Sequence, residues 1–234
     1  MTADRGVLRL GVLASGGGTN LQAILDATGA GGRPRRIPAE VAVVISNVPG
    51  AGALQRAAAA GVATEVLPSK GAADREGYDR ALVERLRAHG VELVCLAGYM
   101  RLVGPAFLSA FAASPATRGC PRVVNVHPGL LPSFPGLHAH RQCLAYGARF
   151  AGCTVHFVDE GTDTGPVIAQ AVVPVLPEDD EASLAARVLV EEHRLYPQAI
   201  RWFAEGRLSV EGRRVRVDGG RTPDGAVENP AIER

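Results

Sequence analysis

Residues 7–25 read VLRLGVLASGGGTNLQAIL, an apolar strand-like run that leads through three contiguous glycines into a helical pattern. The glycines let the backbone turn sharply and leave amide N–H groups uncovered by side chains. Thr19 can cap the following helix, and Gln22 stands three residues later at the capping-box spacing. Free N–H groups at the positive end of a helix dipole favour an anion, and a phosphate monoester suits this loop best.

Two other interpretations of the glycine loop stay open, a dinucleotide site and a purely structural turn. A dinucleotide site needs Gly-x-Gly-x-x-Gly and an acidic residue after the second strand. Here glycines 16–18 are contiguous, and the second strand ends in Ser46 and Asn47. The lysine of nucleotide-binding P-loops is also absent. These features argue against a dinucleotide.

Beyond this stretch, short apolar runs alternate with helical patterns, which predicts βαβ units and a parallel sheet. The predicted strands are residues 7–14, 41–45, 91–97, 122–126, 150–158 and 167–175. Helices are predicted over 21–28, 78–89 and 181–203, with Pro197 bending or interrupting the last, and a hairpin over 208–217.

The predicted fold class is α/β, a Rossmann-like, mostly parallel twisted sheet flanked by helices. We expect one domain over residues 7–218, between a flexible segment at 1–6 and a disordered tail at 219–234.

The bulk composition excludes several classes of partner. Among 234 residues, 25 are basic and 24 acidic, for a net charge of +1, which gives no electrostatic reason to expect nucleic acid or an anionic membrane. The amino-terminal residues resemble neither a signal peptide nor a membrane span. Four scattered cysteines form no Cys-x-x-Cys pair (Cys95, Cys120, Cys143 and Cys153), and the three that lie within or beside apolar runs are predicted to be buried, reduced thiols. We therefore expect a cytoplasmic protein.

The segment around Asn125 and His127 carries the predicted chemistry. Side chains alternate along a strand, so these two project to the same side, and Pro128 ends the strand where α/β sheets bind ligands. A carboxamide can donate to an oxygen that gains negative charge, and an imidazole can move a proton, as acyl transfer requires. Asp163 could be a carboxylate partner that raises the pKa of His127. A structural polar pair and a solvated turn acid remain alternatives.

The other histidines give no metal signature. His138 and His140 form a His-x-His pair, but no third ligand stands at a spacing typical of zinc sites, so we predict no metal. His89 and His193 are interpreted as helix-surface or packing residues. His156, on a predicted strand, fits either the core or the site.

Four motifs in order resemble the phosphoribosylglycinamide formyltransferase family of purine synthesis. They are SGGGTNL at 15–21, AGYMR at 97–101, NVHPGLLPSFPG at 125–136 and DTGP at 163–166. The resemblance implies direct transfer of a formyl group from 10-formyltetrahydrofolate to the amine of 5'-phosphoribosylglycinamide, without a metal. It also implies a monomer or homodimer.

The resemblance assigns roles to individual residues. The catalytic trio would be Asn125, His127 and Asp163. The phosphorylated substrate would be held by Gly18, Thr19, Asn20, Leu21 and Glu192. The folate would contact Arg75, Met100, Arg101, Leu102, Val103, Asn125, Asp159, Glu160, Gly161, Thr162 and Asp163. Gly129 departs from the family, which often has serine there, and is expected to loosen the loop near the folate.

Rival functions are disfavoured by the sequence. Relatives formylate a charged initiator tRNA or a nucleotide sugar, or hydrolyse formyl-folate. The tRNA enzyme and the hydrolase carry extra domains for which these 234 residues leave no room, and the glycine loop favours a small phosphorylated acceptor. A nicotinamide-dependent oxidoreductase would need a different glycine spacing. A non-catalytic binding module would have no use for the Asn, His and Asp set.

Overall fold

The computed structural model describes residues 6–69, 74–221 and 225. The predicted flexible segment at 1–6 and disordered tail at 219–234 lie almost wholly outside these residues, so both stay predictions.

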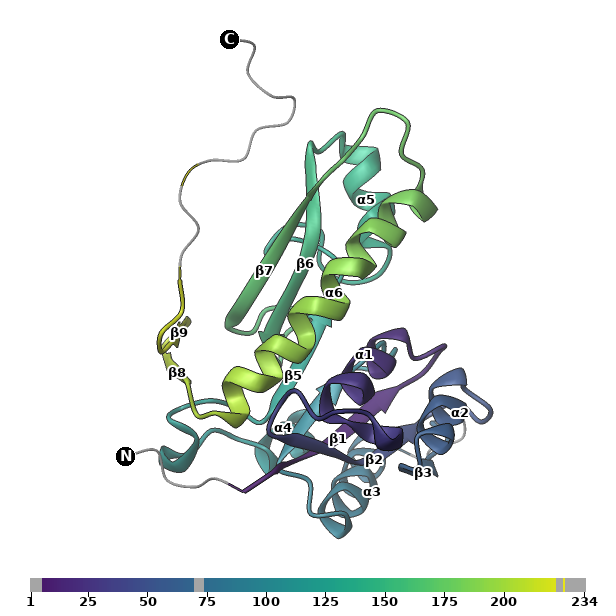
Figure 1. Cartoon of the computed structure of the whole chain (residues 1–234), viewed down its shortest axis with the longest axis vertical. Coiled ribbons are helices and arrows are strands. Elements are labelled where there is room, and N and C mark those ends of the chain that lie inside the picture. Colours follow the sequence, from purple (N-terminus) through teal and green to yellow (C-terminus); the bar gives the residue numbers. More distant parts are fainter. Residues whose placement is uncertain (1–5, 70–73, 222–224, 226–234) are drawn as a thin grey trace.

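Among the described residues, a seven-stranded sheet forms the core of the fold (Figure 1). Its strands are β1 (Leu8–Ala14), β2 (Ala39–Ser46), β3 (Ala63–Val66), β4 (Leu93–Leu96), β5 (Val123–His127), β6 (Phe150–Phe157) and β7 (Val167–Pro174). The order is β3-β2-β1-β4-β5-β6-β7, in which the first five strands are parallel and the last two join antiparallel. The prediction of a mostly parallel sheet flanked by helices is confirmed.

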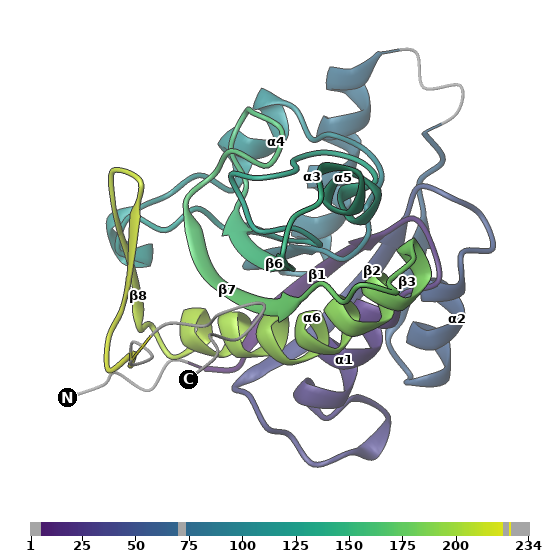
Figure 2. The ribbon, with the colours of Figure 1, turned by 90° about the horizontal axis from the view of Figure 1, so that it is seen from above.

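Helices cover both faces of the sheet. They are α1 (Thr19–Thr28), α2 (Gly52–Ala59), α3 (Arg75–Ala88), α4 (Pro105–Ala110), α5 (Ala139–Tyr146) and α6 (Glu181–Ala204), with short 3-10 turns η1 (Ala30–Gly32) and η2 (Pro115–Thr117). Figure 2 shows α1 and α6 on one face and α3 and α4 on the other. Two apolar clusters, one under each helix layer, form the core.

The apolar spacing of the sequence explains which helix faces are buried. Leu21, Ile24 and Leu25 of α1 are fully buried, as are Leu82 and Leu86 of α3. Each such side chain contributes roughly 1.5–3 kcal/mol of transfer free energy when it leaves water. The central strands β1 and β4 are near-continuous apolar runs because helices cover both of their faces.

Several short elements were not predicted. Strand β3 is mostly exposed, and α2 buries only Ala53 and Ala57, so neither leaves a strong apolar pattern. Helices α4 and α5 are six and eight residues long, too short for a clear period.

Of the bend or interruption expected at Pro197, the bend stays a prediction, and the interruption is wrong, because α6 continues as one helix through that residue. Its neighbours Tyr196 and Ile200 pack in the core, which offsets the hydrogen bond that proline removes.

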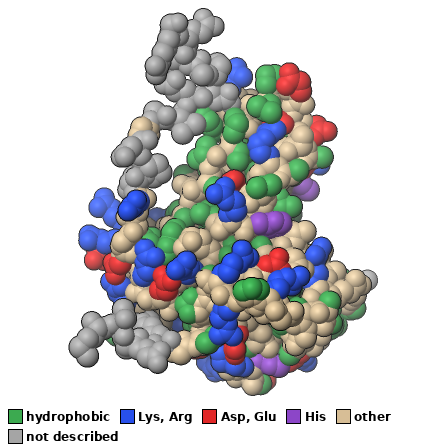
Figure 3. All heavy atoms as spheres, viewed as in Figure 1, with side chains coloured by type: hydrophobic (Ala, Val, Ile, Leu, Met, Phe, Trp, Pro, Cys, Tyr) green, Lys and Arg blue, Asp and Glu red, His purple; other side chains and the backbone are tan. Residues whose placement is uncertain are grey.

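The predicted hairpin is confirmed as β8 (Leu208–Glu211) and β9 (Arg214–Val217). Figure 3 shows basic and acidic side chains interspersed on the face that carries α6. Within the described residues, no helix is both long enough and apolar enough to cross a membrane.

Candidate active site

The glycine loop, residues 15–20, follows β1 and opens α1 in a way that differs from the prediction. Gly18, not Thr19, is the N-cap of α1, and no side chain caps this end. The Gln22 side chain donates to Asp26 instead of completing a capping box. Gly18 has a φ of 75°, and a Cβ at this position would lie 2.7 Å from Cα of Ala53. Backbone conformation and close packing therefore both require glycine here.

Ser15 ties the glycine loop to two neighbouring segments. Its N–H donates to the Gly98 carbonyl at 3.0 Å, and its Oγ donates to Oδ1 of Asn47 at 2.6 Å. The same Oγ accepts from the Met100 N–H at 2.8 Å. A cavity of about 290 Å³ lies between the glycine loop and the segment after β4. The predicted phosphate loop and the predicted folate segment therefore line the same cavity.

Two predicted substrate residues from opposite ends of the chain are in contact. Nδ2 of Asn20 donates to Oε2 of Glu192 at 2.6 Å, which joins α1 to α6. Glu192 is 6% exposed, and burial raises the pKa of its carboxyl, although the bond from Asn20 opposes the shift. The side chain of Leu21 is fully buried in the core, so only its backbone could meet a substrate.

The predicted trio Asn125, His127 and Asp163 forms one cluster that also contains His156. Nδ1 of His127 lies 3.2 Å from Oδ2 of Asp163, and Nε2 of His156 lies 3.6 Å from Oδ1 of the same carboxylate. Nδ2 of Asn125 donates to Nε2 of His156 at 3.2 Å. The β5–β6 register pairs Asn125 with His156, which puts this second histidine, 2% exposed, inside the cluster.

The protonation of His127 corrects one expectation. Its Nε2 donates to the Phe134 carbonyl at 2.9 Å, and the residue is 3% exposed. Burial lowers the pKa of His127, while Asp163 and the Phe134 carbonyl only partly oppose this. As predicted, Asp163 acts to raise the pKa of His127, but the overall pKa of this imidazole is lowered. Desolvation of the imidazolium outweighs its attraction to the carboxylate.

Asp163 is held as an anion in an unusual backbone conformation. Burial raises its pKa, but the neighbouring imidazole of His156, the hydrogen bond from the Gly136 N–H and the charge of His127 outweigh that effect and lower the pKa overall. The Gly136 N–H lies 2.8 Å from Oδ2. The φ of Asp163 is 55°, and these contacts fix it there.

The loop after His127 is held by two residues that the sequence analysis did not select. Oγ1 of Thr154 donates to the Gly129 carbonyl at 2.7 Å and accepts from the Leu131 N–H at 3.1 Å. Nε2 of Gln170 donates to the Leu131 carbonyl at 2.9 Å. Strand alternation places Thr154 on the same side as His156, which is the one signal that could have found it.

Gly129 is packed against this cluster. A Cβ at this position would lie 2.8 Å from Nε2 of His127. The missing side chain therefore leaves the imidazole room to reach the Phe134 carbonyl, and the looser loop near the folate stays a prediction.

The predicted folate residues fall into two groups. Nη2 of Arg75 donates to the Val103 carbonyl at 3.0 Å, so α3 and the segment 100–103 meet. The Arg101 guanidinium lies 4.2 Å from the centre of the Tyr78 ring. Met100 is 66% exposed, and Leu102 is also exposed, so this segment offers apolar side chains to a ligand.

The second group is the loop 159–163, which joins β6 to β7. Oδ1 of Asp159 accepts from the Gly161 N–H at 3.2 Å and from Oγ1 of Thr164 at 2.6 Å. Glu160, Gly161 and Thr162 are exposed, and Asp163 turns inward to the histidines.

Within the described residues, no three His, Cys, Asp or Glu side chains are placed so that they could hold a metal ion together. His138 is exposed at the N-cap of α5, whereas burial lowers the pKa of the neighbouring His140. His89 pairs with Glu65 at 2.6 Å beside α3, and His193 lies on α6, as helix or packing residues would.

Comparisons with known proteins show which chains this one is similar to. The family model described as formyl transferase matches residues 8–200. The chain is 44% identical to phosphoribosylglycinamide formyltransferase of Escherichia coli over 91% of its own length and 94% of that protein. It is 48% identical to the trifunctional purine biosynthetic protein adenosine-3 of Drosophila melanogaster, of which it spans only 14%.

A solved structure is also similar to this chain over most of its length. Glycinamide ribonucleotide transformylase 1 from Symbiobacterium toebii superposes with a TM-score of 0.83 at 55% identity, and the match covers 90% of this chain and 94% of that one.

Proposed function

The chain belongs to the formyl transferase family, and from that premise we propose that it moves a formyl group from 10-formyltetrahydrofolate to the amine of 5'-phosphoribosylglycinamide. The observation that carries the proposal is the cluster of Asn125, His127 and Asp163 close to the glycine loop. The register pairs Leu13 with Leu96 and Leu96 with Asn125, so β1, which carries the loop, and β5, which carries part of the cluster, lie on either side of β4.

In the proposed reaction, the neutral amine attacks the formyl carbon and a C–N bond forms. The carbonyl oxygen gains negative charge, and collapse of the intermediate breaks the bond to the folate nitrogen, which receives a proton from the attacking amine. Asn125 uses one N–H on His156 and keeps its second for the developing oxyanion. A contact of this type is often worth ~3–4 kcal/mol in the barrier.

His127 is proposed to assist both the oxyanion and the proton transfer. Because burial holds its pKa low, the imidazole is predominantly neutral near pH 7, with its proton on Nε2, and it can accept a second proton at Nδ1 beside Asp163. Its Nε2–H is bound to the Phe134 carbonyl, so substrate must replace that carbonyl before Nε2 takes part. Asp163 steadies the imidazolium that forms and helps to order a water for the proton relay.

The substrate is proposed to lie with its phosphate on the glycine loop and its ribose beside Glu192. The loop offers backbone N–H groups, and Glu192 is fixed by Asn20 at the start of the same helix. The folate is proposed to contact Arg75, the segment 100–103 and the loop 159–163, where exposed apolar and polar groups adjoin the cluster.

A two-step assay tests the proposal. The protein is mixed with 10-formyltetrahydrofolate, and 5'-phosphoribosylglycinamide is then added while folate absorbance is followed. The change should begin only with the second addition. A change before it would indicate hydrolysis, and no change after it would refute the proposed acceptor.

A further inference from the structure

Helix α2 holds two successive carbonyl groups of the glycine loop. The Ala53 N–H donates to the Gly16 carbonyl at 3.0 Å, and Nε of Arg56 donates to the Gly17 carbonyl at 2.8 Å. The C=O and N–H of one trans peptide unit point in opposite directions, so these contacts turn the N–H groups of Gly17 and Gly18 away from α2. Neither N–H donates to another backbone carbonyl within the described residues.

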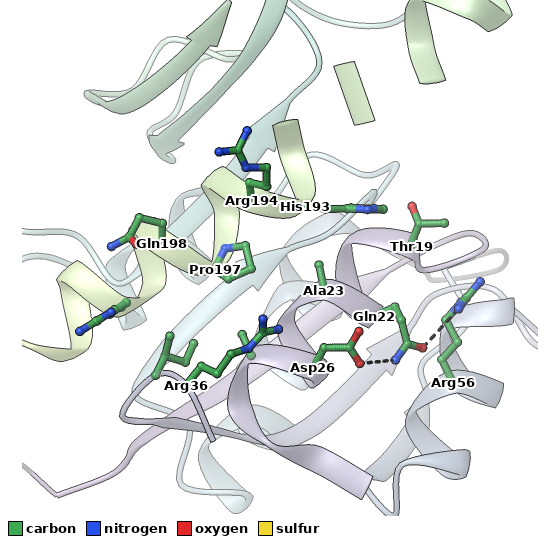
Figure 4. Close-up of a pocket in the computed structure, with 13 residues that line it drawn as sticks. Thr19, Gln22, Ala23, Asp26, Arg36, Arg56, His193, Arg194, Pro197 and Gln198 are labelled. Carbon is green, nitrogen blue, oxygen red and sulfur yellow. Dashed lines mark hydrogen bonds between the residues drawn. The ribbon is translucent and has the colours of Figure 1, made fainter. Parts of the chain in front are cut away.

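Arg56 also brings a positive charge to this corner. Its Nη1 donates to Oε1 of Gln22 at 3.2 Å, a neutral partner, and within the described residues no carboxylate forms an ion pair with the guanidinium. Arg56 lines a cavity of about 520 Å³ between α1, α2 and α6, and Thr19 lines both this cavity and that of the glycine loop. Figure 4 shows Arg56 and Thr19 at the same end of the cavity. The charge therefore lies next to the predicted anion site.

We propose that Arg56 is a positioning residue for the substrate phosphate. It fixes the Gly17 carbonyl so that consecutive N–H groups face the anion, and its charge favours a dianion at that place. The inference rests on the proposed function, because that function supplies the phosphorylated substrate. It adds a charged side chain from another helix to a loop whose own residues carry no positive charge.

The test compares 5'-phosphoribosylglycinamide with the corresponding glycinamide riboside, which lacks the phosphate. For Arg56→Gln, kcat/KM should fall ~10-fold or more with the phosphorylated substrate and less than about 2-fold with the riboside. Competitive inhibition by ribose 5-phosphate should weaken by a similar factor. Arg36→Gln is the matched control, because Arg36 lines the same cavity but donates no hydrogen bond to the glycine loop, and all values should stay unchanged.

Arg56→Lys keeps the charge but loses the planar Nε donor, so its loss should be intermediate. If a thermal melt shows that Arg56→Gln is unstable, the phosphorylated substrate and the riboside are compared with Arg56→Lys instead. Equal losses with both substrates, or no loss with either, would overturn the inference. Failure of the proposed function is a separate outcome, since the wild-type protein would then be inactive with 5'-phosphoribosylglycinamide and formyl-folate.

Discussion

Oδ2 of Asp163 lies 3.2 Å from Nδ1 of His127, although the two residues belong to different parts of the sheet. The carboxylate comes from the loop between β6 and β7, and the imidazole from the last residue of β5. The β5–β6 register pairs Val124 with Phe157 and His127 with Thr154, so the loop after β6 begins beside the start of β5 and folds back to reach the imidazole.

Replacement of His127 or Asn125 by alanine should reduce kcat by roughly 10²-fold or more, because each removes a group proposed to act on the transition state. Steady-state kinetics with both substrates measure the effect, and a thermal melt controls for folding. A near-wild-type kcat in His127→Ala would remove the imidazole from the mechanism.

Asp163→Asn should lower the pKa of His127 further, because the carboxylate opposes the downward effect of burial. The asparagine Oδ1 can still accept from the Gly136 N–H, so the loop should keep its shape. An NMR titration of the imidazole in both proteins checks the direction. The acid limb of the kcat profile should move to lower pH if neutral His127 is required, and a move to higher pH would contradict the assigned interaction.

His156→Phe should lower kcat on the order of 10-fold, because Asn125 loses the acceptor that orients its carboxamide and Asp163 loses a partner. His156→Gln retains a polar group and should lose less. The comparison uses kcat for both variants at saturating substrates. Equal rates in the two variants would show that His156 contributes packing alone.

Gly18→Val should raise the KM of the phosphorylated substrate ~10-fold, because its side chain would press against Ala53 and force the helix start out of place. A β-branched residue at positive φ costs ~1–3 kcal/mol, so the free energy of unfolding should fall as well. Gly18→Ala should raise the substrate KM less and lower the free energy of unfolding less. If Gly18→Val left the substrate KM unchanged, the phosphate would have to bind elsewhere.

Glu192→Gln should stabilise the fold while it weakens substrate binding. The folded-state pKa of Glu192 is raised above its ordinary value of 4.5, so its contribution to stability is fully present below that pH and is lost as pH rises through the folded-state pKa. The free energy of unfolding of Glu192→Gln should therefore exceed that of the wild type above pH 4.5. The difference should level off at higher pH, at about 1 kcal/mol. Chemical denaturation at several pH values measures it, and an advantage that shrinks with rising pH would contradict the sign.

The sequence by itself determined the strand–glycine–helix start, the parallel part of the sheet and the shared side of Asn125 and His127. These follow from local rules, because apolar period, glycine content and strand alternation act over a few residues. The same rules missed β3 and α2, whose residues are too exposed or too small to leave a pattern.

Only the tertiary structure decided the chemical state of the site. His156 enters the cluster through the β5–β6 register, Arg56 reaches the glycine loop from another helix, and Gly18 takes the N-cap because Ala53 leaves room for nothing larger. The pKa of His127 is lowered because the fold removes the imidazole from water, and desolvation depends on everything packed around a group. Spacing along the chain carries no measure of that environment, so the sequence could predict which groups react but not their charge.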